Sequence, residues 1–589
     1  MKKALGLVVL LTLLAAAVRV CQLDRVPLRG DEAFTVRFWA QNPAETWNDL
    51  AQREPHPMGA FVLFWGWKQL AGDSEFAMRA LPLLLNLPGA TLMMALGRRF
   101  IRSWAAVWML GLLWAVNPFQ VWHAQDARNY AIWSVLSTLA MWLFLKAVQR
   151  SQPRDWILYA LAEIAALYVF LLEPFFVLVQ VVYLLLFHRG RVKSAFLTWG
   201  MVMIALIPWF IQLSRLSGSG YEGTAQKVSL EALVSEFIPT ILFGEVAISG
   251  MTGAVLMTVL LVGLGSGGRK QLSTRLLLIL WIFAPLILLM IAGTRLSVFR
   301  PRYVIPITPA VLLSLLWIGF QAKGSKRSLP LLPAVITAVL VGVSLYSLND
   351  YFYEAPPKAP DWRSLARFIE NRDYPNDLVL VTNLDPAFGY YYHGEAEEIP
   401  WSAIQDYAAL LEPGRGVFVQ VGDNTFAASL YLQENAQLIP PVLELVKQFR
   451  PYYTEANEIE NPLDLQVGDV TRLRGYTLLG GDEFGLTIFL YWQPLRRTET
   501  EHVAFVHVLD EGGTYVAGED HVPLNHNAST TAWIPGSLLR DAFAVRVPPG
   551  TYTLEIGMYD SVTKTRLLIQ DVLGNSLGDR FLSDRVEVK

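Results

Sequence analysis

The sequence has very little cysteine and little charge for its length. A single cysteine, Cys21, in 589 residues excludes an intramolecular disulfide. The formal net charge of −3 indicates neither strong nucleic-acid binding nor an acidic tail, so we expect no nucleic-acid partner. Charged residues make up 17% of the chain and hydrophobic residues 53%, which is too apolar for an ordinary soluble protein of this length.

Long apolar runs account for this composition. A helix that crosses about 30 Å of hydrocarbon needs about 20 residues. We place eleven such spans at residues 4–22, 79–97, 104–121, 131–149, 156–172, 175–188, 195–213, 239–264, 275–293, 303–320 and 329–349. The first is interpreted as an uncleaved transmembrane helix rather than a signal peptide, because no convincing cleavage site follows it. The shorter run 60–71 is interpreted as an interfacial or re-entrant helix.

Basic loops predict the orientation of these spans. If residues 60–71 do not cross, every segment assigned to the cytoplasm is basic, as the positive-inside rule requires. These segments are 1–3, 98–102, 146–154, 188–193, 269–275 and 323–327. We therefore expect a multi-pass protein of a bacterial-type plasma membrane, with its N-terminus in the cytoplasm. Asp31, loops 117–130 and 214–238, and the C-terminal region would then lie on the outer face.

The C-terminal region reads as water-soluble and as two domains. In residues 351–455 an amphipathic helix at 361–370 precedes a buried strand at 377–382, and this alternation continues, which is typical of an α/β domain. Residues 456–589 carry alternating strands separated by turn residues, which favours an antiparallel β-sandwich. The predicted architecture is a polytopic α-helical membrane domain (1–350) followed by these two domains.

Four polar motifs gather on the predicted outer face of the first half of the membrane domain. They are Gly30-Asp31-Glu32, Glu54-Pro55-His56-Pro57, Glu75 to Pro82 with Arg79, and Asn117 to Tyr130 with Asp126. Carboxylates beside hydrocarbon are costly unless they pair, bind a cation or do chemistry. Helical spacing would place Asp126 and Tyr130 on one face. The simpler alternative is that Asp31 and Glu32 are solvated loop charges.

In this order, the four motifs resemble the loops of the GT-C membrane glycosyltransferases. They are most similar to the family 39 branch, which includes protein mannosyltransferases and aminoarabinose transferases of lipid A. Pro301-Arg302-Tyr303 to Pro306 resembles the element that opens a late span in this group. The resemblance covers about residues 1–350. One departure is His56-Pro57-Met58, where the family often has His-Pro-Pro.

The resemblance implies transfer of a sugar from a polyprenyl-phosphate donor to an acceptor hydroxyl on a protein, lipid or glycan, with inversion. Asp31 would be the general base. Glu32 and Asp126 would orient the acceptor or bind a divalent cation. Hard oxygen ligands such as Asp31 and Asp126 suit Mg²⁺ or Mn²⁺. No other cofactor is expected.

Further residues are candidates for binding the donor, because a lipid phosphate requires cationic or hydrogen-bonding partners. These substrate-binding candidates are His56, Arg79, Arg128, Tyr130, Arg300 and Arg302. Structural roles remain open for several of them. His56 would serve equally as a turn residue, Arg79 as a partner of Glu75, and Arg300 and Arg302 as snorkelling anchors.

Two other functions compete with glycosyl transfer. A transporter or lipid flippase should have polar residues or broken helices near the middle of the bilayer. Here the predicted spans are mostly uninterrupted and the ionisable residues cluster at the outer edge, which favours the enzyme. A membrane anchor that displays a β-sandwich would need neither eleven spans nor the loop carboxylates.

Overall fold

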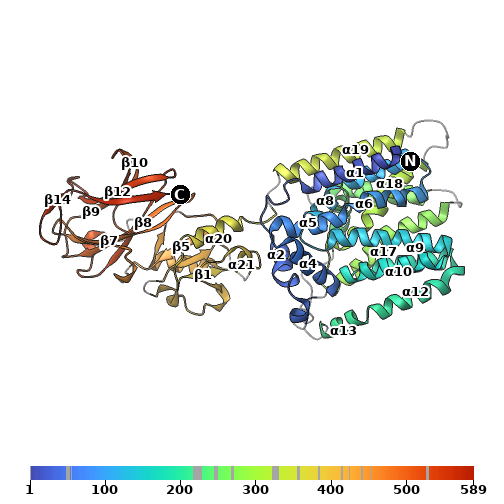
Figure 1. The fold of residues 1–589 in the computed structure, drawn as a ribbon, viewed down its shortest axis with the longest axis horizontal. Coiled ribbons are helices and arrows are strands. Elements are labelled where there is room, and N and C mark those ends of the chain that lie inside the picture. The colour runs from blue at the N-terminus through green and yellow to red at the C-terminus, as the bar shows by residue number, and fades with distance from the viewer. Residues whose placement is uncertain are drawn as a thin grey trace. The chain divides into compact units, whose positions relative to one another are not determined.

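The computed structural model divides into two compact units, Met1–Pro360 and Asp361–Lys589, each described here by itself (Figure 1). The residues that the structure describes are 2–47, 54, 56–216, 229–244, 250–266, 271–321, 331–354, 358–382, 385–412, 415–422, 425–439, 442–452, 454, 456–524 and 529–588.

The first unit is helical. Its main helices are α1 (Lys2–Val20), α2 (Gly30–Phe34), α4 (Met58–Ala71), α5 (Glu75–Asn86), α6 (Pro88–Phe100), α7 (Trp104–Ala115), α8 (Pro118–Ala124), α9 (Tyr130–Arg150), α10 (Pro153–Val169), α11 (Pro174–Phe187), α12 (Val192–Ala205), α13 (Ile207–Leu216), α15 (Ile238–Phe243), α16 (Gly250–Gly265), α17 (Leu272–Gly293), α18 (Thr308–Gln321) and α19 (Leu331–Asn349). Short π- and 3₁₀-helical segments, η1 (Thr35–Trp39) and η5 (Pro301–Ile307), follow α2 and precede α18.

A helix lies at each of the eleven predicted spans, but the count of eleven membrane crossings is not confirmed. Among the described residues, five helical segments are long and apolar enough to cross a membrane, or up to seven if each bent helix pair is one span. The long segments are Glu75–Phe100, Tyr130–Arg150, Leu272–Gly293, Pro301–Phe320 and Pro333–Glu354. Two of the predicted basic loops, 323–327 and the part of 269–275 with Arg269 and Lys270, lie outside the described residues.

Two segments form the centre of the bundle. The most apolar windows of Tyr130–Arg150 and Pro301–Phe320 are 78% and 83% buried, against 28% for Pro333–Glu354. Helix α9 packs along α10 (Figure 1), and its first residue, Tyr130, contacts Arg302 and Tyr303 of η5. The N-terminal ends of these two buried segments therefore meet, which brings Tyr130 close to Arg302.

The second unit begins with α20 (Trp362–Glu370) and a five-stranded sheet of order β2-β1-β3-β5-β4. The strands are β1 (Leu378–Val381), β2 (Glu397–Pro400), β3 (Val417–Gln420), β4 (Gln437–Ile439) and β5 (Val446–Arg450). Strand β1 pairs in parallel with β2 and β3, and β5 runs antiparallel to β3. This arrangement is the predicted α/β fold.

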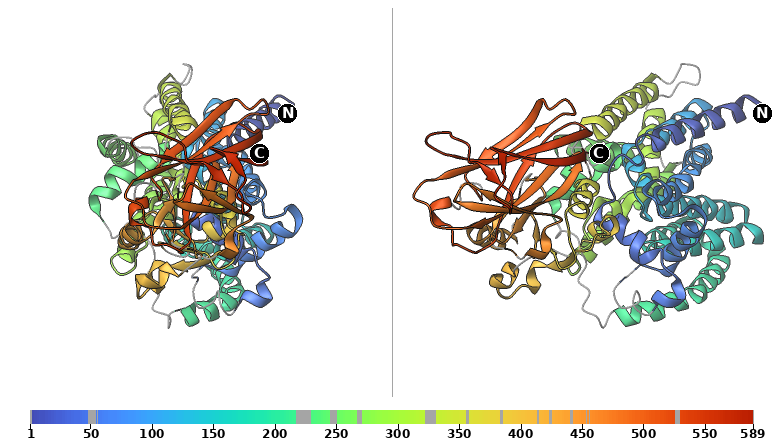
Figure 2. Two further views of the ribbon diagram at one scale, coloured as in Figure 1. Left: turned by 90° about the vertical axis from the view of Figure 1, so that its left-hand side faces the viewer. Right: turned by 60° about the vertical axis from the view of Figure 1, so that its left-hand side comes forward.

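The rest of the second unit is an antiparallel β-sandwich, as predicted. Its sheets have the orders β10-β9-β12-β15 and β11-β8-β7-β6-β13-β14 (Figure 2). The strands are β6 (Asn461–Val467), β7 (Thr471–Asp482), β8 (Gly485–Pro494), β9 (His502–Leu509), β10 (Tyr515–His521), β11 (Leu539–Val545), β12 (Gly550–Asp560), β13 (Ile569–Gln570), β14 (Ser576–Gly578) and β15 (Phe581–Val588). Side chains of both sheets form one core that includes Trp492 and Trp533.

Candidate functional site

Glu32 is buried, and its carboxylate holds three segments of the site together. Its side chain is fully inaccessible, and its two oxygens accept hydrogen bonds from Arg79 Nε and Nη2, both at 2.7 Å. The main-chain N–H of Ala127 donates to the same carboxylate at 3.0 Å, and that of Arg29 at 3.1 Å. Glu32 thus joins the start of α2 to α5 and to the loop after α8. A role in orienting the acceptor stays a prediction, but this geometry favours positioning.

Arg79 organises the loop that leads from α1 to α2. Beyond its ion pair with Glu32, its Nη1 donates to the carbonyls of Leu23 at 2.9 Å and Val26 at 2.8 Å. Its Nη2 also donates to the carbonyl of Pro27 at 3.1 Å. The guanidinium nitrogens of Arg79 therefore all donate to protein oxygens, and a phosphate could bind Arg79 only by displacing several of these hydrogen bonds.

Asp126 is buried and neutralised by an arginine that the sequence did not single out. Arg29 Nη2 donates to both of its carboxylate oxygens, at 2.8 and 2.6 Å. His123 Nδ1 lies 3.8 Å from the same group. Burial raises the pKa of Asp126, but Arg29 and His123 outweigh this and hold the pKa well below its usual range. Asp126 is therefore ionised and paired.

Asp31 is the carboxylate that stays open. Its side chain is 45% exposed, and its Oδ2 lies 3.4 Å from Arg302 Nη2. Arg128 Nη1 donates to the main-chain carbonyl of Asp31 at 3.2 Å and to Thr35 Oγ1 at 3.1 Å. Burial raises the pKa of Asp31, but the positive charges of Arg128, Arg302 and Arg29 lower it by more, so the pKa lies below its ordinary value. Asp31 is therefore an ionised carboxylate whose side chain is accessible from solvent.

Of the two predicted arginines that flank Pro301, only Arg302 lies close to Asp31. The Arg302 guanidinium lies 5.3 Å from the Tyr130 ring centre, so it belongs with Asp31 and Arg128. Arg300 precedes η5, and its buried Nε has no hydrogen-bond partner in the part of the chain that the structure describes. Within the same residues, the Arg300 side chain forms no hydrogen bond or ion pair with Asp31 or Asp126.

His56 is held by Glu54, which was in the predicted motif but not among the predicted site residues. Its Nδ1 contacts a Glu54 carboxylate oxygen, and Gln212 Nε2 donates to the main-chain carbonyls of Glu54 at 3.2 Å and His56 at 3.0 Å. The other ring nitrogen, Nε2, is buried and finds no partner among the described residues. Burial raises the pKa of Glu54, but His56 more than offsets this and lowers it.

Aromatic rings connect His56 to the carboxylate site. The His56 ring centre lies 5.4 Å from Trp39 and 5.1 Å from Phe170. The Arg128 guanidinium stacks 4.0 Å above Trp39, and Phe170 lies 5.5 Å from Tyr130. His56 is therefore one ring away from Arg128 on one side and from Tyr130 on the other.

Lys358 is a second residue that the sequence did not indicate. Its Nζ donates to the carbonyl of Trp122 at 3.3 Å and lies 4.2 Å from the centre of that indole. Burial lowers the pKa of Lys358 to about 7, although Asp126 and Glu32 act in the opposite direction. Nothing in the local sequence signals this contact, because Lys358 and Trp122 are 236 residues apart.

The predicted divalent-cation ligands do not fit a cation in this arrangement. Both oxygens of Asp126 are occupied by Arg29, and Asp31 faces Arg302. Within the described residues, no group of three or more His, Cys, Asp or Glu side chains is placed to hold a metal ion. A cation at Asp31 and Asp126 would have to compete with the guanidinium groups of Arg302 and Arg29.

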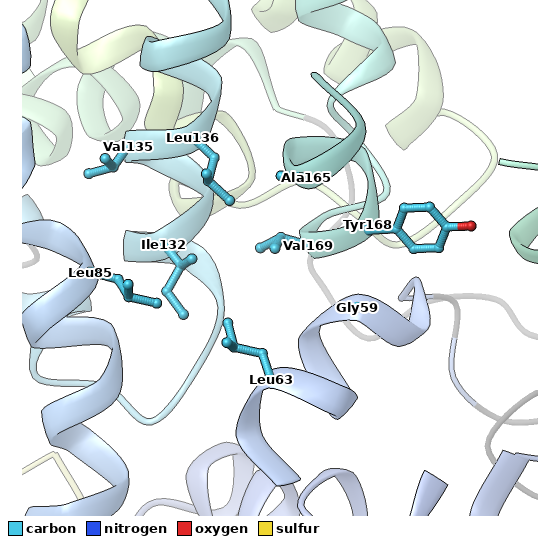
Figure 3. Close-up of a pocket in the computed structure, with 9 residues that line it drawn as sticks. All are labelled: Gly59, Leu63, Leu85, Ile132, Val135, Leu136, Ala165, Tyr168 and Val169. Atoms are coloured by element: carbon cyan, nitrogen blue, oxygen red, sulfur yellow. The ribbon is translucent and has the colours of Figure 1, made fainter. Parts of the chain in front are cut away.

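An apolar cavity of about 280 Å³ opens beside this site (Figure 3). Its lining residues are Gly59, Leu63, Leu85, Ile132, Val135, Leu136, Ala165, Tyr168 and Val169. They come from α4, α5, α9 and α10. Figure 3 shows the Tyr168 ring directed away from this space, and its hydroxyl donates to the carbonyl of Ala205 at 2.6 Å. Gly59 and Val169 place the cavity next to His56 and Phe170 along the chain.

Comparison with solved structures shows which fold this is. The chain is similar to ArnT from Cupriavidus metallidurans in the apo state, with 15% identity and a TM-score of 0.54, over 76% of this chain and 98% of that chain. The structure of the same protein bound to undecaprenyl phosphate matches with 15% identity and a TM-score of 0.52, over 75% and 98%. The chain has the GT-C glycosyltransferase fold.

A family match agrees with this GT-C fold. Residues 55–213 match the family described as dolichyl-phosphate-mannose-protein mannosyltransferase. The matched segment contains His56, Arg79, Asp126, Arg128 and Tyr130. It indicates that the protein is a membrane glycosyltransferase. A search of curated proteins finds no significant match.

Proposed function

We propose that this protein transfers a sugar from a polyprenyl-phosphate carrier to an acceptor hydroxyl at the outer face of the plasma membrane, with inversion at the sugar carbon. The single observation that carries the proposal is the contrast among the site carboxylates. Glu32 and Asp126 are buried in arginine pairs, whereas Asp31 is ionised and 45% exposed. The GT-C fold and the mannosyltransferase match supply the reaction class.

Asp31 is the general base in this proposal. The acceptor hydroxyl donates its proton to Asp31 Oδ as its oxygen attacks the sugar carbon, and the polyprenyl phosphate leaves with the bonding electrons. General base catalysis of this kind contributes about 10²- to 10⁴-fold to a rate. Arg302 holds the carboxylate from one side, 3.4 Å from Oδ2. Arg128 fixes the main chain of the same residue at 3.2 Å.

His56 is the proposed contact for the donor phosphate. Its buried Nε2 lacks a partner among the described residues, and the carboxylate of Glu54 holds the ring through Nδ1, so Nε2 is the ring nitrogen left to meet the donor phosphate. His56 also precedes Pro57, the N-cap of α4, and the main-chain N–H groups of the first turn of a helix favour negative charge. Glu54 and His56 therefore act as a pair, in which the carboxylate orients the imidazole.

The adjacent cavity suits a prenyl chain. Its lining is aliphatic apart from Tyr168, whose hydroxyl is engaged elsewhere. A chain that enters between α4 and α9 would bring its phosphate to the His56 end of α4. Undecaprenyl phosphate is the lipid bound in one of the similar ArnT structures, which supports a lipid donor of the same class here. The acceptor is proposed to be a protein, lipid or glycan hydroxyl.

The orientation of the chain is part of the proposal. The basic segments predict a cytoplasmic N-terminus and place Asp31 and residues 361–589 outside the cell. A divalent cation is not required by the described donor set, because Arg29, Arg79, Arg128 and Arg302 already balance its carboxylates. The transporter alternative is not favoured by the fold or the family match.

Incubation of the purified protein with a panel of polyprenyl-phosphate sugars and measurement of the released polyprenyl phosphate tests the proposal. Wild-type protein should release lipid phosphate with at least one donor, and Asp31→Asn should not. Asp73→Asn is a matched control, because Asp73 is 60% exposed and lies 3.4 Å from Lys68. Full turnover by a folded Asp31→Asn protein would remove the assigned base. No turnover with any donor would refute the proposed reaction.

A further inference from the structure

A second pair of carboxylates lies away from Asp31, inside the helical bundle. Glu163 belongs to α10, and Glu173 precedes α11. Both side chains are fully inaccessible, and their carboxyl groups are within hydrogen-bonding reach of each other. The mechanism proposed above uses neither residue.

No cation balances this pair within the described residues. The groups that face it from the surrounding helices are neutral: Trp133 and Ser137 of α9, Tyr159 of α10, and Gln180 of α11. Two adjacent carboxylates that both carry charge, without a cationic partner and away from water, are strongly disfavoured. One of them must therefore retain its proton at neutral pH.

The hydrogen bonds indicate which carboxyl keeps the proton. Glu173 accepts at both oxygens, from Trp133 Nε1 at 2.5 Å and from Ser137 Oγ at 2.9 Å. Glu163 accepts from Gln180 Nε2 at 3.1 Å with Oε2 only, and its buried Oε1 has no partner in the described part of the chain. Donors directed at both oxygens stabilise the ionised form of Glu173, whereas Oε1 of Glu163 is available to carry a hydrogen.

We propose that Glu163 carries a proton on Oε1 and donates it to ionised Glu173, so that the two act as one buried acid pair that positions the aromatic wall of the site. The link to the wall runs through Trp133. Its indole donates to Glu173 and stacks on Phe170 with ring centres 4.2 Å apart. Phe170 in turn contacts His56 and Tyr130. The positioning role of this acid pair rests on the proposed function. The shared proton is independent of that function.

Infrared spectroscopy of the purified full-length protein tests the shared proton directly. The difference spectrum of wild type minus Glu163→Gln should contain, at neutral pH, the carbonyl stretch of a protonated carboxylic acid, and this band should move to lower frequency in D₂O. A difference spectrum that contains only carboxylate bands would overturn the proposal. Glu231→Gln serves as the control, because Glu231 is exposed and its difference spectrum should lack the acid band.

Thermal stability tests which partner holds the proton. In Glu163→Gln the amide N–H replaces the shared proton, so the melting temperature should equal or exceed that of wild type. It should also lose the decline that the wild-type melting temperature shows as the pH rises above about 4.3, the ordinary pKa of a glutamate in the unfolded chain, because folding of the variant no longer requires a bound proton. Glu173→Gln directs an amide at Trp133 and Ser137 and should melt several degrees lower. Equal effects of the two variants, or the reverse order, would overturn the assignment.

Turnover separates this inference from the proposed reaction. If wild type transfers sugar, its rate should decline at alkaline pH, and Glu163→Gln should shift that decline to higher pH. An active wild type whose alkaline limb is unchanged in Glu163→Gln would overturn the positioning role while leaving the reaction intact. A wild type without transferase activity would overturn the reaction and the positioning role together, and the infrared result would still decide the shared proton.

Discussion

Asp31 and Glu32 are neighbours in the chain, yet their carboxylates lie in opposite environments. Glu32 is fully buried and receives two hydrogen bonds of 2.7 Å from Arg79, whereas the Asp31 side chain is 45% exposed and lies 3.4 Å from Arg302. In the first turn of α2 the two side chains diverge, so one enters the protein and the other faces the site. This divergence separates a positioning residue from a candidate base.

Replacement of Glu32 should therefore affect folding more than replacement of Asp31. Glu32→Gln leaves Arg79 buried without its counter-charge, and removal of one partner of a buried ion pair costs about 3–5 kcal/mol. We expect a clear loss of thermal stability in Glu32→Gln and little loss in Asp31→Asn, measured by thermal unfolding in detergent. Equal melting temperatures for the two variants would contradict a stabilising role of the ion pair between Glu32 and Arg79.

The pH dependence of turnover should reflect the low pKa of Asp31. A base must be ionised to accept a proton, so the rate falls only when the pH drops through its pKa. Because Arg128, Arg302 and Arg29 outweigh burial and lower that pKa, the acidic limb should lie below about pH 4. Arg302→Gln removes one of these charges and should move the limb to higher pH. An unchanged limb in this variant would show that Asp31 does not govern it.

Glu54→Gln tests the orientation of His56. Loss of the carboxylate removes the charged partner that orients the imidazole, and a hydrogen bond to a charged group is worth about 1.5–3 kcal/mol, or at least about tenfold in affinity. We expect KM for the donor to rise about tenfold, with a smaller change in kcat. Glu45→Gln is the control, since Glu45 is exposed and bonds only to Asn42 among the described residues. A fall in kcat alone would argue against phosphate binding.

The cavity should control the use of long prenyl chains. Leu63→Trp fills part of the space between α4 and α9, so KM should rise for a long-chain donor and much less for a short-chain donor. Leu161→Trp is a matched control, because Leu161 is 59% exposed on the surface of α10. Competition between donors of two chain lengths measures the effect. The same KM increase for both lengths would place the prenyl chain elsewhere.

A histidine in the β-sandwich should make the second unit less stable in alkaline solution. Burial lowers the pKa of His521, but hydrogen bonds to Asp541 and Glu519 raise it to about 9. The stabilisation is therefore complete below the unfolded pKa of about 6.5 and is lost as the pH rises through 9, with an upper limit of about 3 kcal/mol. Hydrogen exchange in β10 and β11, corrected for intrinsic rates, should show this loss in the full chain. His521→Gln should remove the pH dependence, and a variant that kept it would exclude His521 as the cause.

The sequence predicted the positions of the helices, whereas the number of membrane crossings stays a prediction. Hydropathy locates each apolar run, because burial in hydrocarbon sets composition. It does not reveal that the run 104–121 bends by 47° between α7 and α8, where Asn117 caps the second helix. The turn of 117° between α11 and α12, by contrast, falls at the basic segment 188–193 that the sequence placed between two separate spans. The length of an apolar run in the sequence therefore does not give the length of a single straight helix.

For the candidate site, the sequence singled out most of the residues that the structure brings together, but not their hydrogen-bond partners. Asp31, Glu32 and Asp126 were recognisable as carboxylates in loops. The ion pair of Arg29 with Asp126 joins residues 97 positions apart, and that of Arg79 with Glu32 spans 47 positions. Such pairs depend on how α2, α5 and the loop after α8 pack, which no local pattern encodes. Role therefore followed from packing, and residue type alone could not assign it.

The membrane domain extends beyond the last apolar residue of α19, because residues that follow this helix still contact the rest of the domain. Tyr351 donates from its hydroxyl to Gln125 at 2.8 Å, and Lys358 holds the carbonyl of Trp122. Both contacts fasten the loop that carries Asp126, and both come from residues beyond the apolar stretch. A chimaera that grafts a different soluble module onto this domain should therefore be joined after Pro360. A junction at residue 350 would remove both contacts to α8 and the loop that follows it, together with the linker.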